Sequence, residues 1–142
     1  MNITFKILLP VFLLFPLSIF AQNESPIDSE LTACIDKDPS THGVLHCIDN
    51  AYKKWDDELN NYYQKLIDLL DDSAKDKLKE AERKWIEYRD LEFKNIEGIY
   101  SKKEGTMYLP MLAIDKMNVI KRRALQLRDY YQLDRVLGNG TI

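Results

Sequence analysis

Apolar residues recur at steps of three and four through two consecutive segments of the chain, 44–69 and 74–99. This spacing places them on one face of a helix, so it predicts two long amphipathic helices. The first series is Val44, Ile48, Ala51, Trp55, Leu59, Tyr62, Leu66 and Leu69. The second is Ala74, Leu78, Ala81, Trp85 and Tyr88, followed at the same spacing by the polar Glu92 and then by Ile96 and Ile99. Strands are not indicated, because no Asn-Gly or Asp-Gly turn lies between alternating apolar runs.

Polar residues at the ends of both series mark where the helices start and stop. Ser40 and Thr41 are candidate N-caps for the first helix, and the cluster at 71–73 ends that helix. Ser73, with Asp76 three residues later, resembles a capping box at the start of the second helix, with Asp in place of the usual Glu or Gln. The turn between the two helices is therefore expected at residues 71–73.

A third helix is expected from near Thr106 to about Leu137. Pro110 falls in its first turn, where a proline is tolerated because no intrahelical hydrogen bond is lost. A hydrophobic fraction of 45% argues against a disordered chain. Three long helices with short connections predict an all-α fold, an antiparallel three-helix up-down-up bundle.

The first 21 residues have the composition of a secretory signal peptide. Lys6 is their only charged side chain, and a 14-residue apolar run precedes the polar stretch that begins at Gln22. That run is shorter than the ~20 residues of a membrane-spanning helix, which favours a cleaved signal over an uncleaved anchor helix. Cleavage is expected near Ala21, so we expect a periplasmic or secreted protein with no stable membrane insertion. Residues 22–142 are expected to form one domain with its core at about 34–137.

Cys34 and Cys47 are the two cysteines of the chain. Oxidising compartments favour pairing an even number of cysteines, and a bond between these two closes a loop of 14 residues. On the loop-entropy model this cross-link stabilises the protein by about 3 kcal/mol. His42 and His46 lie beside Cys47 at helical spacing, but neither a second cysteine pair nor a His-Glu-x-x-His pattern accompanies them. We therefore predict a disulfide that tethers a short N-terminal helix at about 28–35, and no metal site.

The two predicted amphipathic helices bring an acid and a base to the same level. If the chain folds back at residues 72–73, residues whose numbers sum to about 145 lie opposite one another. Asp56 then faces Arg89, and each lies beside an apolar stripe. The sequence therefore predicts an interhelical ion pair between Asp56 and Arg89, with a structural role.

Two patterns stand on these helices: Asp-x-Glu-Leu-Asn-x-x-Tyr from Asp56 to Tyr63, and Trp-x-x-x-Arg-Asp from Trp85 to Asp90. With the two cysteines upstream, they resemble the lysozyme inhibitor LprI family of small exported bacterial proteins. The resemblance covers roughly residues 34–127 and implies a secreted, disulfide-bearing helical domain. The signature residues, for which we expect a structural role, are Asp56, Leu59, Asn60, Tyr63, Trp85, Arg89 and Asp90.

The chain departs from the family pattern at two places. Glu82 stands where family members often carry Gln. Many relatives also have a second cysteine pair, and here Phe93 occupies the first of those positions while the second falls at 115–117. Because Phe93 is expected to lie level with about Met117, an apolar contact is predicted in place of the second bridge.

No pattern typical of an enzyme active site is present. The sequence contains neither a Gly-rich phosphate loop nor a Gly-x-Ser-x-Gly elbow. With 20 Lys and Arg against 23 Asp and Glu, the chain also lacks the basic balance of a DNA-binding domain. We therefore predict a non-catalytic protein with no cofactor, which acts by binding a protein partner.

Acidic residues are concentrated in the N-terminal half of the expected mature chain. Residues 22–72 carry 12 acids and four bases, whereas residues 106–142 carry three acids and six bases. Lysozymes of the animal type are basic proteins whose cleft holds two carboxylates, so an acidic inhibitor would be steered toward them. The alternative is that the acidic first helix only pairs with the basic third helix inside the bundle. The candidate partner-binding residues are Asp68, Asp71, Asp72 and Asp76 around the first turn, and His42 as a hydrogen-bond donor.

Two other functions remain open. One is an envelope interaction module that binds another partner and does not inhibit lysozyme. The other is a periplasmic carbohydrate-fragment binder that uses aromatic residues such as Trp55, Tyr63 and Trp85, although their helical spacing places them first in a core. The basic run at 121–123 is interpreted as a solvated helix face rather than as a site for anionic lipid.

Overall fold

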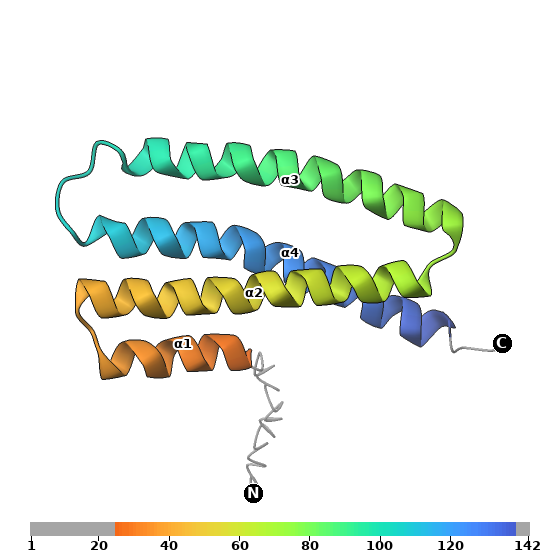
Figure 1. The fold of residues 1–142 in the computed structure, drawn as a ribbon, viewed down its shortest axis with the longest axis horizontal. Coiled ribbons are helices and arrows are strands. Elements are labelled where there is room, and N and C mark those ends of the chain that lie inside the picture. Colours follow the sequence, from red (N-terminus) through yellow and green to blue (C-terminus); the bar gives the residue numbers. More distant parts are fainter. Residues whose placement is uncertain (1–24, 139–142) are drawn as a thin grey trace, which may run out of the picture.

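The computed structural model describes residues 25–138, which form four α-helices and no strand (Figure 1). The helices are α1 (Pro26–Lys37), α2 (Thr41–Leu69), α3 (Asp72–Tyr100) and α4 (Tyr108–Gly138). The all-helical prediction is thus confirmed for this range, and α1 extends two residues beyond each end of the helix expected at 28–35. The predicted signal peptide, residues 1–21, lies outside the described residues.

The cap of α2 is as the sequence predicts, whereas the cap of α3 differs. The Ser40 hydroxyl accepts a backbone hydrogen bond of 3.1 Å at the start of α2. At the start of α3 the Asp71 carboxylate accepts from the Ala74 N–H at 2.8 Å, so the predicted capping box at Ser73 is wrong. The reason is that α2 ends at Leu69 and the connection is short, which places Ser73 inside the first turn of α3.

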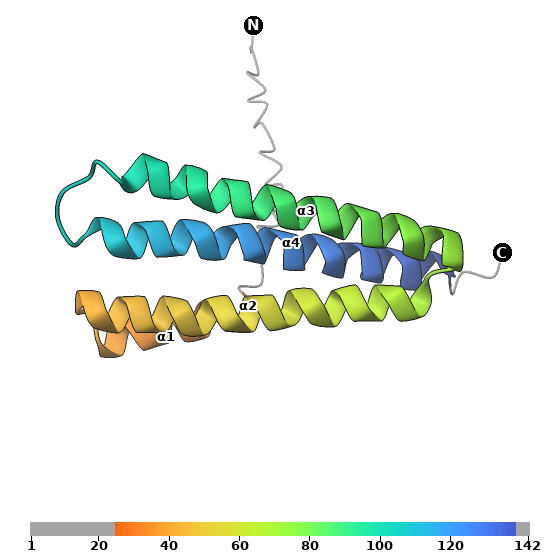
Figure 2. The same ribbon diagram turned by 45° about the horizontal axis from the view of Figure 1, so that its top comes forward.

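The chain reverses direction at the connections from α2 to α3 and from α3 to α4 (Figure 1). Figure 2 shows α4 running between α2 and α3. Helix α4 packs most extensively on α2 and less on α3, while α2 and α3 make few direct contacts. The two long helices that are consecutive in the sequence are therefore held apart by the third.

The hydrophobic core is the seam between α2 and α4. Ile48 on α2, and Ile120 and Leu127 on α4, are its most deeply buried large side chains. The predicted stripe on α2 is confirmed from Ile48 to Leu66, whereas Leu69 at the end of the helix is exposed. The buried residues that pack together are Ile48, Ala51, Trp55, Leu59, Leu66, Met117, Ile120, Ala124 and Leu127.

Helix α3 buries much less than its apolar pattern predicts. Of its 29 residues, Glu82 and Ile96 are buried. Tyr88 and Ile99, which belong to the predicted stripe, are more than half exposed. Because α3 packs mainly on α4, only a narrow part of its apolar face is covered.

Phe93 attaches the C-terminal half of α3 to α4 at the predicted level. The Lys116 ammonium nitrogen lies 5.4 Å from the centroid of the Phe93 ring. Phe93 also packs against the core cluster that contains the buried Met117. The expected alignment of residue 93 with residues 116–117 is therefore confirmed, and apolar packing joins the helices there.

Helix α1 is a peripheral element held mainly by cross-links. The Cys34–Cys47 disulfide joins it to α2, as predicted. Asp28 of α1 pairs with Lys121 of α4 at 2.6 Å, and the half-buried Ile27 packs against the core cluster. Because α1 has no buried residue of its own, these few contacts define its position.

The Tyr100 hydroxyl ties the end of α3 to α4 by donating a hydrogen bond to Asp115 at 2.8 Å. That bond, with smaller contributions from burial and the Asp115 charge, raises the pKa of Tyr100 above its usual value. The neutral phenol is thus favoured in the folded state. Its stabilising contribution is complete below the unfolded tyrosine pKa of about 10 and is lost as pH rises through the higher folded pKa.

We expect the melting temperature of the wild-type protein to fall more steeply between pH 9 and pH 12 than that of Tyr100→Phe. The reason is that the variant has no phenol at position 100 whose ionisation would break the hydrogen bond to Asp115. Thermal melts followed by circular dichroism across this range measure the difference. Tyr88→Phe is the matched control, because Tyr88 is exposed on the same helix. A Tyr100→Phe curve parallel to both others would contradict the role of this hydrogen bond.

Candidate functional site

The signature residues meet in a groove between α2 and α3. The groove has a volume of about 320 Å³ and is open along the side where the two helices diverge. Asp90 is the signature residue that does not line it. The lining residues are Asp56, Leu59, Asn60 and Tyr63 from α2, and Lys79, Glu82, Arg83, Trp85, Ile86 and Arg89 from α3. We call this space the signature groove.

The predicted ion pair between Asp56 and Arg89 is wrong. Arg89 donates instead to its sequence neighbour Asp90, at 2.9 Å from Nε and 2.7 Å from Nη2. Asp56 accepts only a long side-chain hydrogen bond from Asn60, at 3.4 Å. Both residues line the signature groove, but Arg89 pairs with Asp90 on its own helix rather than across the groove with Asp56.

The buried interhelical ion pair lies about two turns away along α3, between Glu82 of α3 and Arg123 of α4. Arg123 donates to Glu82 Oε2 from Nε at 3.0 Å and from Nη2 at 2.6 Å. Its remaining terminal nitrogen donates to Gln126 at 2.7 Å. The two side chains are only 11% and 8% exposed, so the pair is shielded from water. It links the weakly packed α3 to the core.

Neither member of this pair was identified as functional from the sequence. Glu82 was noted only as a departure from the family pattern, and Arg123 belongs to the run at 121–123 that was interpreted as a solvated face. That interpretation is wrong for two of the three residues, because Lys121 pairs with Asp28 of α1. The spacing of Glu82 from Leu78 and Trp85, four and three residues away, places it on the apolar face and was the available signal.

Charged groups lie close to two aromatic residues at or near the groove, Trp85 and Tyr52. The guanidinium carbons of Arg89 and Arg123 lie 5.7 Å and 5.8 Å from the centroid of the Trp85 ring. Burial raises the pKa of Tyr52, and the negative charge of Asp56 raises it further.

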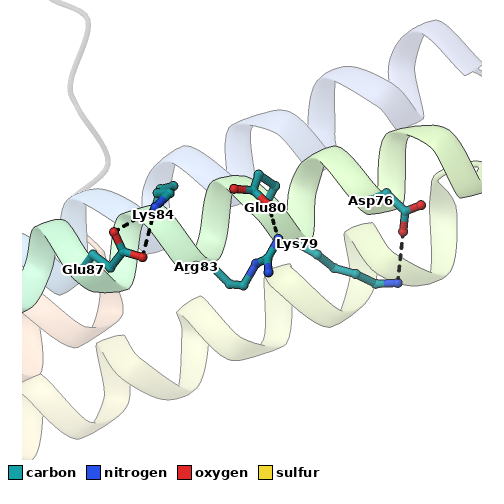
Figure 3. Close-up of polar contacts among 6 residues, drawn as sticks. All are labelled: Asp76, Lys79, Glu80, Arg83, Lys84 and Glu87. Atoms are coloured by element: carbon teal, nitrogen blue, oxygen red, sulfur yellow. Dashed lines mark hydrogen bonds and ion pairs between the residues drawn. The ribbon is translucent and has the colours of Figure 1, made fainter.

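Exposed ion pairs within α3 flank the groove. Figure 3 shows Asp76 with Lys79, Glu80 with Arg83, and Lys84 with Glu87. Lys79 and Arg83 line the groove, whereas Lys84 does not. Each pair is three residues apart on one helix, so its contribution to stability is small, at about 0.2–0.5 kcal/mol.

The structure brings four of the five candidate partner-binding residues together. Asp68, Asp71, Asp72 and Asp76 are all exposed around the turn between α2 and α3. Asp71 also caps α3, so it has a structural role. His42 is exposed at the opposite end of α2, which at about 1.5 Å per residue lies roughly 40 Å away. His42 therefore does not belong to the same surface.

The bases of α4 do not neutralise the acids of α2. Within residues 25–138 the interhelical ion pairs of α4 join Lys116 to Glu97 of α3, Lys121 to Asp28 of α1, and Arg123 to Glu82 of α3. None of them reaches α2. The alternative in which the acidic helix is only an internal partner of the basic helix is therefore not supported in this part of the chain.

No group of three or more His, Cys, Asp or Glu side chains that could hold a metal ion is found in the described range. His46 instead shares a hydrogen bond of 3.1 Å with the Asn50 side chain. None of the four helices is long and apolar enough to cross a membrane.

Comparison with known proteins gives a family and a structural relative. The family described as "Lysozyme inhibitor LprI" matches residues 34–127. A crystal structure of an uncharacterized protein from Burkholderia thailandensis is similar, with a TM-score of 0.70 and 29% sequence identity over 76% of this chain and 54% of that chain. The chain thus spans about half of the length of that protein. No curated protein matches.

Proposed function

Because the chain belongs to the LprI family of lysozyme inhibitors, we propose that it is an exported, non-catalytic protein that blocks a cell-wall lysozyme by protein–protein contact. The family match over residues 34–127 is the observation that carries this proposal. The Cys34–Cys47 disulfide supports export, since such bonds persist in oxidising compartments. Removal of residues 1–21 as a signal peptide belongs to the same proposal.

The acidic surface at the turn between α2 and α3 supports a basic partner. Asp68, Asp72 and Asp76 are exposed there, and their local partners are lysines or glutamine on the same helices. Exposed pairs of this kind are weak and leave the surface negative toward an approaching protein. A basic lysozyme would be steered to this end of the molecule. His42, at the other end of α2, is no longer part of the proposed contact.

A carbohydrate-fragment binder is less well supported, because it needs an open aromatic face for the sugar ring. Trp55 is buried. Trp85 is half-buried, and the guanidinium groups of Arg89 and Arg123 already lie near its ring. The remaining alternative is an envelope interaction module that binds another partner. Only an assay of lysozyme inhibition distinguishes it from the proposed function.

The direct test is a turbidity assay of cell-wall lysis by an animal-type lysozyme, with and without the purified protein. We expect lysis to slow as the protein approaches a molar excess over the enzyme. Unchanged lysis at several-fold excess would exclude inhibition of that lysozyme class and favour the envelope-module alternative.

A variant with Asp68→Asn, Asp72→Asn and Asp76→Asn is expected to associate with the lysozyme about 3–10 times more slowly at low salt, because local negative charge is removed. Asp71 is kept, since it caps α3. Stopped-flow or surface-binding kinetics measure the rate, and the difference should shrink as salt is added.

The matched control removes the same charge at the opposite end of the molecule, by Asp36→Asn, Asp49→Asn and Glu104→Gln. These acids lie near the end of α1, in the first half of α2 and in the connection before α4 (Figure 1). Equal association rates for the two triple variants would show that the contact surface is elsewhere.

A further inference from the structure

The bases that line the signature groove are already paired. Lys79 lies 3.5 Å from Asp76, Arg83 contacts Glu80, and Arg89 lies 2.7 Å from Asp90. All three pairings stay within α3. Each of these cations therefore has an acid of its own helix, and not Asp56, within ion-pair distance.

Two carboxylates line the groove, and in the described part of the chain one of them is paired with a cation and the other is not. Glu82 is held by two hydrogen bonds from Arg123. Asp56 is half-buried, and in the described part of the chain no Lys, Arg or His approaches it within ion-pair distance. Among residues 25–138 its side chain accepts one hydrogen bond, the long 3.4 Å contact from Asn60. A partly desolvated carboxylate without a cation is uncommon unless it serves a site.

We infer that the signature groove is an anchor pocket for an arginine or lysine side chain of a basic protein partner, with Asp56 as its counter-ion. This inference rests on the proposed function, because it states how that partner is held. It also gives a binding role to signature residues whose expected role was structural.

The shape and the lining of the groove fit such a side chain. Its volume of about 320 Å³ suits one long side chain rather than a folded segment. Tyr63 lies seven residues after Asp56, so both project from the same face of α2. The Tyr63 ring can receive the face of a guanidinium or the stem of a lysine, while Asn60 offers its amide oxygen as an acceptor.

Charge complementarity identifies the class of partner. The groove has α2 as one wall, and the acidic turn that carries Asp68, Asp72 and Asp76 lies between the same two helices. A basic protein drawn to this end of the molecule would present many Lys and Arg side chains to the groove. Buried arginine anchors that fill a pocket are typical of residues that dominate interface affinity.

The decisive comparison is between Asp56→Asn and Asp57→Asn. The two substitutions remove the same charge from adjacent residues of α2, but Asp56 lines the groove whereas Asp57 is exposed and does not. Both variants therefore change the long-range electrostatic attraction of a basic partner by the same amount. We expect Asp56→Asn to weaken binding to an animal-type lysozyme at least tenfold in titration calorimetry, and Asp57→Asn to weaken it less than twofold. Thermal melts confirm that both variants are folded.

A small probe tests the pocket without any lysozyme. N-acetyl-arginine amide is titrated into the isotopically labelled protein while the NMR signals of the Trp85 indole N–H and the Asn60 side-chain amide are followed. We expect saturable shifts in the wild type and in Asp57→Asn, and their loss in Asp56→Asn. The uncharged analogue N-acetyl-citrulline amide should give no saturable shift.

The outcomes separate this inference from the proposed function. Failure to inhibit lysozyme, with saturable and Asp56-dependent binding of the arginine probe, would overturn the proposed partner and support the pocket. Inhibition of lysozyme with equal affinities for Asp56→Asn and Asp57→Asn would overturn the pocket and support the proposed function. Absence of probe shifts in the wild type would also overturn the pocket.

Discussion

Arg123→Ala is expected to lower the free energy of unfolding by about 3–5 kcal/mol, because it leaves the Glu82 carboxylate buried without its cation. This ion pair is the main polar link between α3 and the core, and α3 has little buried apolar surface to replace it. Urea denaturation followed by far-UV circular dichroism measures the loss.

Two further variants show whether burial is the cause. Arg122→Ala removes the adjacent, exposed arginine and should change stability by less than about 0.5 kcal/mol. The double variant Glu82→Leu with Arg123→Met removes both charges and should be about as stable as the wild type, since apolar pairs often replace buried ion pairs without loss. An Arg123→Ala loss no larger than that of Arg122→Ala would show that the pair is solvated.

Cys34→Ser with Cys47→Ser is expected to cost about 3 kcal/mol, the entropy of the loop that the disulfide closes. In the native state we expect the loss of stability to be confined mainly to α1. Helix α1 has no buried residue. Without the bond it depends on the Asp28–Lys121 and Glu30–Lys54 ion pairs and on half-buried side chains such as Ile27 and Leu31.

Native-state amide exchange resolves this effect by element. We expect the amides of α1 to lose protection in the double serine variant, while those of α2 and α4 along the seam keep theirs. Serine at both positions keeps the volumes similar and avoids a free thiol. Equal loss of protection in α1 and at Ile48 or Leu127 would show that α1 is an integral part of the core.

The local features of this fold could be predicted from sequence because they depend on neighbouring residues. A step of three or four positions defines a helix face, and Ser40 defines the start of α2. The two cysteines of the chain form the expected disulfide. Helix α3 ends at Tyr100, and in the connection that follows Gly105 adopts a positive φ of 101° that glycine tolerates well.

The packing partners could not be predicted in the same way. Short connections suggest that consecutive helices pack together, yet α4 lies between α2 and α3. The sequence of α4 itself indicates this arrangement, because Met117, Val119 and Ile120 are apolar and are buried at nearly consecutive positions. Such a pattern is typical of a helix covered on more than one side.

At the signature groove, too, local features could be predicted from sequence whereas the pairing of charges could not. Register arithmetic predicts Asp56 and Arg89 at one level from the position of the turn, and both residues line the signature groove. Whether the two charges meet depends on the distance between the helices and on competing partners, and here Asp90 is the nearer partner of Arg89. The pairing of Glu82 with Arg123 involves residues 41 positions apart and no shared local pattern.

The central position of α4 sets the order in which this chain can acquire its structure. The seam joins α2 to the last helix, so core residues some 50–80 positions apart must meet before either is sheltered from water. Helix α3 is made between them and has too few buried residues to hold α2 in place alone. During synthesis or export the growing chain therefore remains without a core until its final helix emerges. Truncation before Leu127 should leave separate helices exposed to proteases rather than a smaller version of the same domain.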